Sequence, residues 1–359
     1  MNIFQIKNNY IEQTSNFAQK DQPSSGRSPF WDSLKIWLIY IVVYGHMIES
    51  CVDSSRFNQA MYNFIYLFHM PLFVFISGRF SHIKNRNKYL SRMLAIFETY
   101  FIFQLIRCLK SLFIGGQLSL FPDILIPKGI LWYLACLLLW RLIIIISTER
   151  FLKQYKWYVL TFFLVSGLGI GFFIIPDGTV IRFFTLGLFF FMGYYSNEQQ
   201  LRTILQKLSV RCAIILLSSI WLFVFFFLNI DIQSVIYFGS YYDNPPTSPL
   251  YYFCARLFLY IFAITVGYLI MRIVFAKPVL SKYGNCTLAI FMYHIFFVMA
   301  LRQLFANHTI PSNEIFLIGY TICICTILTW IIRKYKIVTI MLNPFSYLFN
   351  LYQSNKTKN

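Results

Sequence analysis

The chain has 359 residues, of which 58% are hydrophobic, 20% are aromatic and only 12% are charged. Soluble domains are about one quarter charged residues, so this composition excludes an ordinary soluble protein. A formal net charge of +18 would suggest a nucleic-acid partner in a soluble chain. In so apolar a chain, the basic residues are instead expected to mark cytoplasmic loops, and no nucleic-acid partner is expected.

Apolar runs of about 20 residues recur along the chain, and each can cross a hydrocarbon layer of roughly 30 Å. The runs are too long for the strands of a membrane β-barrel and lack their alternating pattern. The sequence therefore predicts an all-α, polytopic membrane helix bundle of about ten transmembrane helices. In chain order, the expected spans are 30–50, 61–79, 93–114, 129–147, 157–175, 180–196, 211–230, 251–275, 284–305 and 314–333.

The loops between these spans alternate in charge. Lys and Arg gather around 84–92, 150–156, 202–211, 277–282 and 333–336, whereas the loop 231–250 has none. By the positive-inside rule, this pattern predicts that both termini are cytoplasmic. The loop 231–250 either covers an extracytoplasmic cleft or is an ordinary connector.

The domain organisation follows from the same pattern. Residues 1–29 are polar and show no cleavable signal peptide, so they are expected to form a cytoplasmic tail. Residues 30–335 are expected to form one membrane domain, and residues 336–359 a basic cytoplasmic tail.

The first span carries four ionisable residues on one stripe. At about 100° per residue, Asp32, Lys35, His46 and Glu49 share one helix face, with Lys35 near the cytoplasmic end and His46 in the outer half. A cation there can hold an anionic donor, while a histidine takes a proton from an attacking hydroxyl and Glu49 orients its ring. Alternatively, Asp32 and Lys35 are interfacial anchors, and His46 simply pairs with Glu49 or another helix.

Other polar residues also lie within or near the spans. Each is as readily a structural pair or an anchor as a site residue, but together they favour a polar cavity enclosed by the bundle. They are Glu98, Arg107, Arg141, Arg256 and Arg302, together with His69, Arg182 and His294. The eight cysteines lack zinc-ligand spacing and are interpreted as small apolar fillers. No metal site is therefore expected.

Five segments, in this order, resemble the integral-membrane acyltransferase 3 superfamily and, within it, the fucose 4-O-acetylase-like branch. They are "FWDSLKIWLIYIVVYGHMIE" (30–49), "FIYLFHMPLFVFISGRFS" (64–81), "ILWYLACLLLWRL" (130–142), "IRFFTLGLFFFMGYY" (181–195) and "GNCTLAIFMYHIFFV" (284–298). The resemblance implies transfer of an acyl group, usually acetyl from acetyl-CoA, to a sugar hydroxyl of a surface polysaccharide or its lipid-linked precursor.

The resemblance also assigns residues. The family's catalytic histidine falls on His46, and the arginine that many members have eleven residues earlier is Lys35 here, which keeps the charge but loses the bidentate fork. The family's Arg-rich stretch before a proline reads "YLSRMLAIFETY", with Arg92 as its only arginine and no proline. We expect Lys35, Lys84, Arg86 and Arg92 to bind the donor. The other motif positions are expected to line the acceptor cavity: His69, Trp132, Arg182 and His294.

The sequence thus predicts a multi-pass O-acyltransferase of the bacterial cytoplasmic (inner) membrane. Acyl-CoA is the expected donor substrate, no cofactor is expected to be bound, and the acceptor is a sugar or lipid-linked glycan. His46 is the expected general base, with Glu49 beside it and Arg182 as a candidate cation for the developing oxyanion. The alternative is a transporter or flippase for a lipid-linked sugar, whose buried charges would hold an anionic substrate. A purely structural membrane subunit explains the buried charges poorly.

Overall fold

The computed structural model describes residues 28–113, 126–173, 175, 178–228, 248–306 and 313–348. These residues form helices and connecting turns with no strand, as predicted. Most of the predicted outer loop 231–250 lies outside the described residues. The same is true of residues 1–27 of the predicted N-terminal tail and of residues 349–359 of the C-terminal tail.

Eight helical segments in the described part of the chain are long and apolar enough to cross a membrane. They are α2 (Pro29–Ile48) with η1 (Glu49–Ser54), α3 (Arg56–Arg79), η2 (Gly129–Leu131) with α6 (Trp132–Ile146), α9 (Gly178–Tyr195), α11 (Val210–Phe227), α12 (Pro249–Ala276), α13 (Thr287–Ala306) and α14 (Glu314–Lys334). The prediction of an all-α, polytopic membrane bundle is confirmed.

The two other expected spans are helices of a different character. The helix α4 (Arg86–Phe113) is long enough, but Lys88, Arg92, Glu98 and Arg107 are spaced along it. The helix α8 (Lys156–Gly169) continues into η3 (Ile170–Phe172), and together they are apolar but shorter than the other spans. Both helices present exposed aromatic side chains, as expected of surfaces that face lipid: Phe97 and Phe101 on α4, and Trp157 and Phe162 on α8.

Short helices lie in the connecting segments where the basic residues gather. They are α7 (Glu149–Gln154), α10 (Glu198–Gln206), η5 (Ser281–Tyr283) and α15 (Lys336–Ile340). Side-chain caps begin several of the helices: the Asn197 side chain, for example, accepts hydrogen bonds from the first backbone N–H groups of α10. This cap fixes the start of α10 close to the end of α9.

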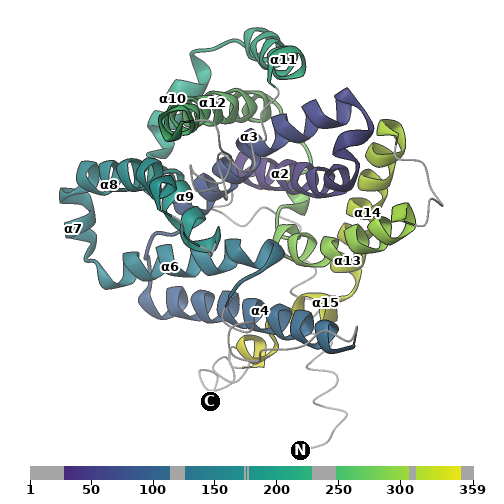
Figure 1. Cartoon of the computed structure of the whole chain (residues 1–359). Helices are drawn as coiled ribbons and strands as arrows, with labels where there is room; N and C mark the ends of the chain where they lie inside the picture. The colour runs from purple at the N-terminus through teal and green to yellow at the C-terminus, as the bar shows by residue number, and fades with distance from the viewer. Residues whose placement is uncertain are drawn as a thin grey trace, which may run out of the picture.

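The helix α3 lies at the centre of the bundle, next to α2, and packs against α2, α9, α11 and α12 (Figure 1). Glycines allow its close crossing with α9, since Gly78 meets the backbone of Phe190 and Gly193 meets the backbone of Phe75. A Cβ at either glycine would collide with the partner helix. This crossing fixes α3 against α9, and α2 and α3 both contribute residues to the site.

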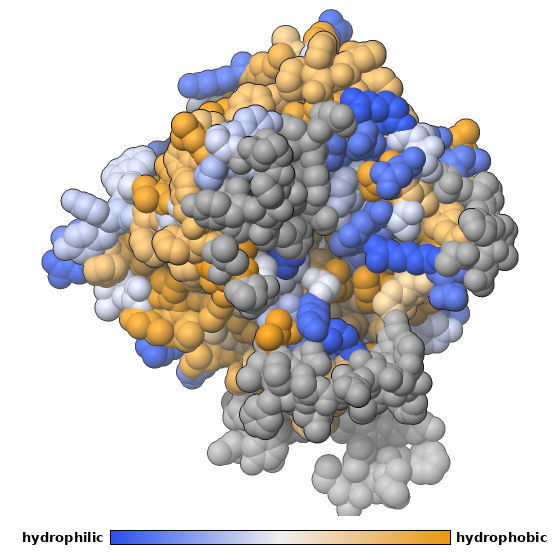
Figure 2. All heavy atoms as spheres, in the orientation of Figure 1, coloured by the Kyte–Doolittle hydropathy of each residue, from blue (hydrophilic) through white to orange (hydrophobic). Residues whose placement is uncertain are grey.

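The outer surface is largely apolar. Broad hydrophobic areas cover the face shown in Figure 2, interrupted by hydrophilic residues near its middle and toward the right. Isoleucine, leucine and phenylalanine side chains of α11, α12 and α14 are among the most exposed, for example Ile215, Phe227, Ile261 and Ile322. In water such a surface would aggregate, whereas lipid chains cover it at no such penalty.

Candidate active site

The stripe predicted on the first span exists in the structure. Its four ionisable residues form two pairs: Lys35 Nζ lies 2.7 Å from an Asp32 carboxylate oxygen, and His46 Nδ1 lies 3.2 Å from Glu49 Oε2. About 16 Å of helix separates Lys35 from His46, and the residues between them on this face, Ile39 and Val42, are buried. Each end of the stripe opens into its own cavity.

The first cavity, called the basic cavity here, has a volume of about 940 Å³. It lies between the start of α2, the end of α3, the start of α4 and α10. Six basic side chains line it: Lys35, Arg79, Lys84, Lys88, Arg92 and Arg202. Three of the four predicted donor-binding residues are therefore brought together. The fourth, Arg86, is exposed at the start of α4 and is not among the residues that line the cavity.

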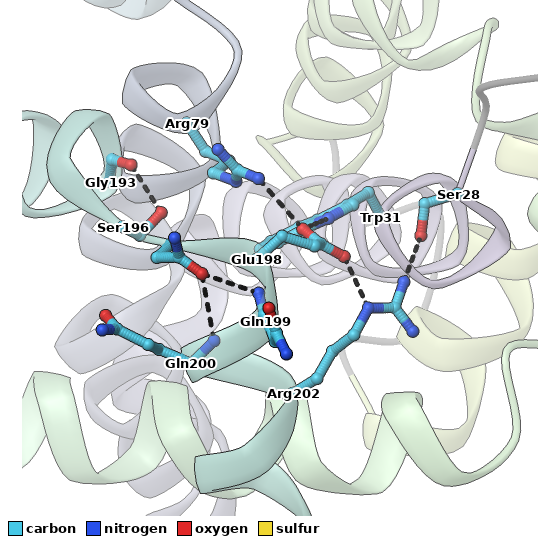
Figure 3. Close-up of polar contacts among 10 residues, drawn as sticks. Ser28, Trp31, Arg79, Gly193, Ser196, Glu198, Gln199, Gln200 and Arg202 are labelled. Atoms are coloured by element: carbon cyan, nitrogen blue, oxygen red, sulfur yellow. Dashed lines mark hydrogen bonds and ion pairs between the residues drawn. The ribbon is translucent and has the colours of Figure 1, made fainter.

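A carboxylate organises one wall of the basic cavity. Figure 3 shows side chains from α3, α2 and α10 converging on Glu198. Arg79 Nη2 donates at 3.2 Å and Trp31 Nε1 at 2.9 Å to Glu198 Oε2, while Arg202 Nε donates at 2.8 Å to Oε1. Burial opposes ionisation of Glu198, but these three donors outweigh it and hold the pKa of the carboxyl below its ordinary value.

The second cavity, called the histidine cavity here, has a volume of about 400 Å³. It lies at the far end of α2, between α3, α6, α9 and α13. Five of the predicted catalytic and acceptor-site residues line it: His46, Glu49, His69, Trp132 and Arg182. The sixth, His294, is fully buried beside the cavity, where its ring stacks on that of His46 with 5.4 Å between the centroids.

The hydrogen bonds of His46 define its tautomer. A carboxylate can only accept, so Nδ1 carries the proton that points to Glu49, and in the neutral imidazole Nε2 keeps the lone pair. The same carboxylate oxygen, Glu49 Oε2, accepts a 2.7 Å hydrogen bond from Arg302 Nη2. Arg302 therefore fixes Glu49, and Glu49 fixes the imidazole. A base oriented by a third group is the arrangement by which enzymes activate a hydroxyl.

The other cavity residues are held by local contacts. His69 Nδ1 donates to the Ile65 carbonyl at 2.7 Å, one helical turn earlier. His294 Nδ1 donates in the same way to the Ile290 carbonyl at 3.2 Å. The Arg182 guanidinium lies 4.7 Å from the centroid of the Trp132 ring, a cation–π contact. The cavity therefore offers an oriented histidine, a cation and an aromatic ring.

Several other ionisable residues in the spans have structural roles. Arg256 donates to the Gly167 carbonyl at 3.1 Å, and Arg141 donates to Ser81 Oγ at 3.2 Å. Glu98 accepts from the backbone N–H of Ser346 at 2.9 Å. These contacts tie separate helices together, which fits the structural interpretation that the sequence left open for them.

Sequence reasoning did not name Arg79 and Glu198, and it gave Arg302 and Arg202 no specific role in the site. The only available signal for Arg302 was an arginine within an apolar run, and its partner Glu49 lies 253 positions earlier. Glu198 lies in a basic connecting segment, 119 positions from Arg79 and 167 from Trp31. Helical spacing relates residues within one helix, so it gives no sign of pairs between distant helices.

A histidine oriented by a carboxylate at one end of a buried stripe, and a cationic cavity at the other, lie within a multi-pass helix bundle. The family model described as an acyltransferase domain matches residues 28–332. The protein is thus a membrane acyltransferase, and the chain belongs to the acyltransferase 3 superfamily. Comparisons with curated proteins and with solved structures found no match. The predicted superfamily is confirmed, and the fucose 4-O-acetylase-like branch stays a prediction.

Proposed function

We propose that the protein transfers an acetyl or other small acyl group from acyl-CoA to a sugar hydroxyl. The acceptor belongs to a cell-surface polysaccharide or its lipid-linked precursor, and the enzyme resides in the bacterial cytoplasmic membrane. One observation carries this proposal: α2 places the Lys35 end of its stripe in the basic cavity and His46 in the histidine cavity. The donor can therefore enter from one side of the membrane and the acceptor from the other, and the two can meet within the bundle.

The basic cavity is the proposed donor site. CoA carries phosphate groups, and lysine and arginine side chains bind phosphates through charge-assisted hydrogen bonds. Six such side chains line the cavity, and the carboxylates Asp32 and Glu198 offset only part of their charge. The positive-inside rule assigns this end of the bundle to the cytoplasm, which is where acyl-CoA is available.

The histidine cavity is the proposed site of chemistry. His46 Nε2 takes the proton of the acceptor hydroxyl as its oxygen bonds to the thioester carbonyl carbon. The carbonyl oxygen gains the negative charge, and Arg182 stabilises it. The carbon–sulfur bond then breaks, the acyl group stays on the sugar as an ester, and the CoA sulfur leaves with the proton from His46. Glu49, clamped by Arg302, stabilises the imidazolium between these steps.

The lining of the histidine cavity suits a sugar. The Trp132 ring offers an apolar face for the C–H side of a sugar ring, and Arg182 and Tyr66 offer polar groups for its hydroxyls. A site that mixes one aromatic face with a few fixed polar groups orients such a ring toward Nε2 of His46.

The test uses the purified protein in lipid nanodiscs with acetyl-CoA and a glycan extract of its own membranes. We expect release of free CoA thiol that depends on the extract, together with acetylated glycan detected by mass spectrometry. His46→Ala, purified in equal amount, is expected to show neither. A transporter or flippase would leave acetyl-CoA intact, so absence of thiol release with the wild-type protein contradicts the proposal.

A further inference from the structure

One face of α3 runs from the histidine cavity toward the basic cavity. At about 100° per residue, Met70, Phe73, Ser77 and Phe80 lie within one sector of the helix. Met70 lines the histidine cavity and Phe80 lines the basic cavity. Residues 62–72 of α3 are all buried, whereas Phe73 and Ser77 are only half-buried. Phe73 and Ser77 therefore lie partly exposed at the level between the cavities.

A hydroxyl pair lies at this level. Ser77 Oγ is 2.6 Å from the Tyr133 hydroxyl oxygen and 2.9 Å from the Phe73 carbonyl oxygen. A carbonyl only accepts, so the single Ser77 hydroxyl proton goes to Phe73, and the Tyr133 hydroxyl must donate to Ser77. This assignment uses both protons and leaves a lone pair on the Tyr133 oxygen. The pair can therefore accept a hydrogen bond from an N–H group.

Aromatic rings surround the hydroxyl pair. The rings of Phe73, Tyr133 and Phe291 pack on one another, with centroid distances of 5.5, 5.4 and 6.4 Å. Phe291 also lines the histidine cavity. The three rings form apolar walls on the histidine-cavity side of the pair. A ligand that fits this place is a chain with an N–H group opposite the Tyr133 oxygen and neighbouring methylene groups against the rings.

We propose that Ser77 and Tyr133 form a binding subsite for an amide N–H of the donor's pantetheine arm. The arm is a flexible chain in which amide groups alternate with short apolar segments. Its N–H donates to the Tyr133 oxygen, its methylenes pack against Phe73 and Phe291, and its thioester is directed toward His46. The subsite rests on the proposed function, because it requires that the donor is an acyl-CoA held in the basic cavity.

The test compares two ligands of the purified full-length protein by isothermal titration calorimetry. CoA carries the arm, whereas adenosine 3′,5′-bisphosphate has the nucleotide and phosphates without it. Tyr133→Phe is expected to weaken CoA binding about five- to tenfold, the loss of one neutral hydrogen bond. Ser77→Ala leaves the acceptor in place but releases the Tyr133 hydroxyl, so it is expected to weaken CoA binding by a smaller factor. Binding of the bisphosphate is expected to stay unchanged, which also shows that each variant is folded.

Tyr260→Phe is the matched control. The Tyr260 hydroxyl is likewise buried in the bundle and donates to the Thr185 carbonyl at 2.7 Å, away from both cavities. This variant is expected to bind both ligands as the wild type does. Phe73→Trp provides a steric test, since a larger ring at the half-buried position should weaken CoA binding and spare the bisphosphate.

Each possible result either supports or contradicts the proposed subsite. If Tyr133→Phe and Ser77→Ala bind CoA as tightly as the wild type, the subsite is wrong. It is equally wrong if they weaken both ligands by the same factor, because the effect is then not on the arm. A wild-type protein that binds neither ligand contradicts the proposed function itself, and with it the subsite. This failure is distinguishable from the others because it does not involve the variants.

Discussion

The two cavities at the ends of α2 are built in opposite ways. The basic cavity is large, and its charge is spread over six side chains from several helices. The histidine cavity has less than half that volume, and Glu49 is the only carboxylate among the described residues that line it. Glu49 alone connects His46 to Arg302, through a single oxygen atom. The proposed donor binding is therefore distributed over many side chains, whereas the proposed chemistry depends on a chain of single contacts.

The largest expected effect is at His46. In His46→Ala, acyl transfer should fall by a factor of about 10² to 10⁴, the usual contribution of a general base. CoA affinity should stay at the wild-type value, because the proposed phosphate site lies at the other end of α2. Transfer from radiolabelled acetyl-CoA to glycan, with calorimetry for CoA, measures both. A loss of less than tenfold in transfer would contradict the role of His46.

Substitutions of Arg302 test whether Glu49 needs its hydrogen bond from Arg302 in order to orient His46. Removing a charged hydrogen bond at this site should lower the rate of transfer about tenfold to a hundredfold in Arg302→Gln. Arg302→Lys keeps the charge and should recover part of the loss. The rate at saturating acetyl-CoA is the measurement, and CoA affinity should not change. Equal rates for Arg302→Gln and the wild type would show that Glu49 holds His46 without help.

Single cations of the basic cavity should matter less. Lys84→Gln and Arg92→Gln should each weaken CoA binding only severalfold, and more at low salt, because five other cations remain. Transfer at saturating acetyl-CoA should be unaffected. Arg86→Gln is the matched control, since Arg86 does not line the cavity and should have no effect. If Arg86→Gln weakens binding as much as Arg92→Gln, the boundary of the donor site is wrong.

The smallest expected effect concerns Glu198. Its pKa is lowered in the folded protein, so its ion pairs stabilise the fold above the unfolded-state pKa of about 4.5. This stabilisation is lost as pH falls through the lower, folded-state pKa. The melting temperature of Glu198→Gln should therefore lie below that of the wild type at about pH 7, and the gap should close in strong acid.

The control for Glu198 is the exposed pair of Glu149 with Lys153, whose Nζ lies 2.8 Å from the carboxylate. Solvent screens such a pair, so Glu149→Gln should leave the melting temperature nearly unchanged at every pH. A pH-independent gap for Glu198→Gln would mean that the carboxylate contributes through packing, with no part for its charge.

The sequence predicted those features that lie within one helix or one loop. Helical spacing in α2 placed Lys35 and His46 on one face of the helix. The run of basic residues after the second span indicated that Lys84 and Arg92 would bind the donor. Eight membrane spans followed from apolar runs of sufficient length. In each case the physical signal is periodicity or composition over neighbouring residues, which the chain displays directly.

The remaining features depend on contacts between helices. Glu49 could be placed beside His46 by spacing, but its clamp Arg302 comes from α13. The pair Ser77–Tyr133 joins α3 to α6, and neither residue stands out among its apolar neighbours. The helix α4 differs from the other spans because charged residues are spaced along it, between exposed apolar residues such as Phe97 and Phe101. Helix packing decides these features, and no local pattern encodes it.

The central claim is that the basic cavity binds the donor and the histidine cavity carries out the transfer. Two variants, assayed side by side, test it most directly. His46→Ala and the double variant Lys84→Gln/Arg92→Gln are compared for labelled acetyl transfer over a range of acetyl-CoA concentrations. We predict that the double variant regains the wild-type rate once acetyl-CoA is saturating, whereas His46→Ala stays about 10²- to 10⁴-fold slower at every concentration. Wild-type transfer by His46→Ala, present in the membrane at the normal amount, would contradict the placement of the chemistry in the histidine cavity.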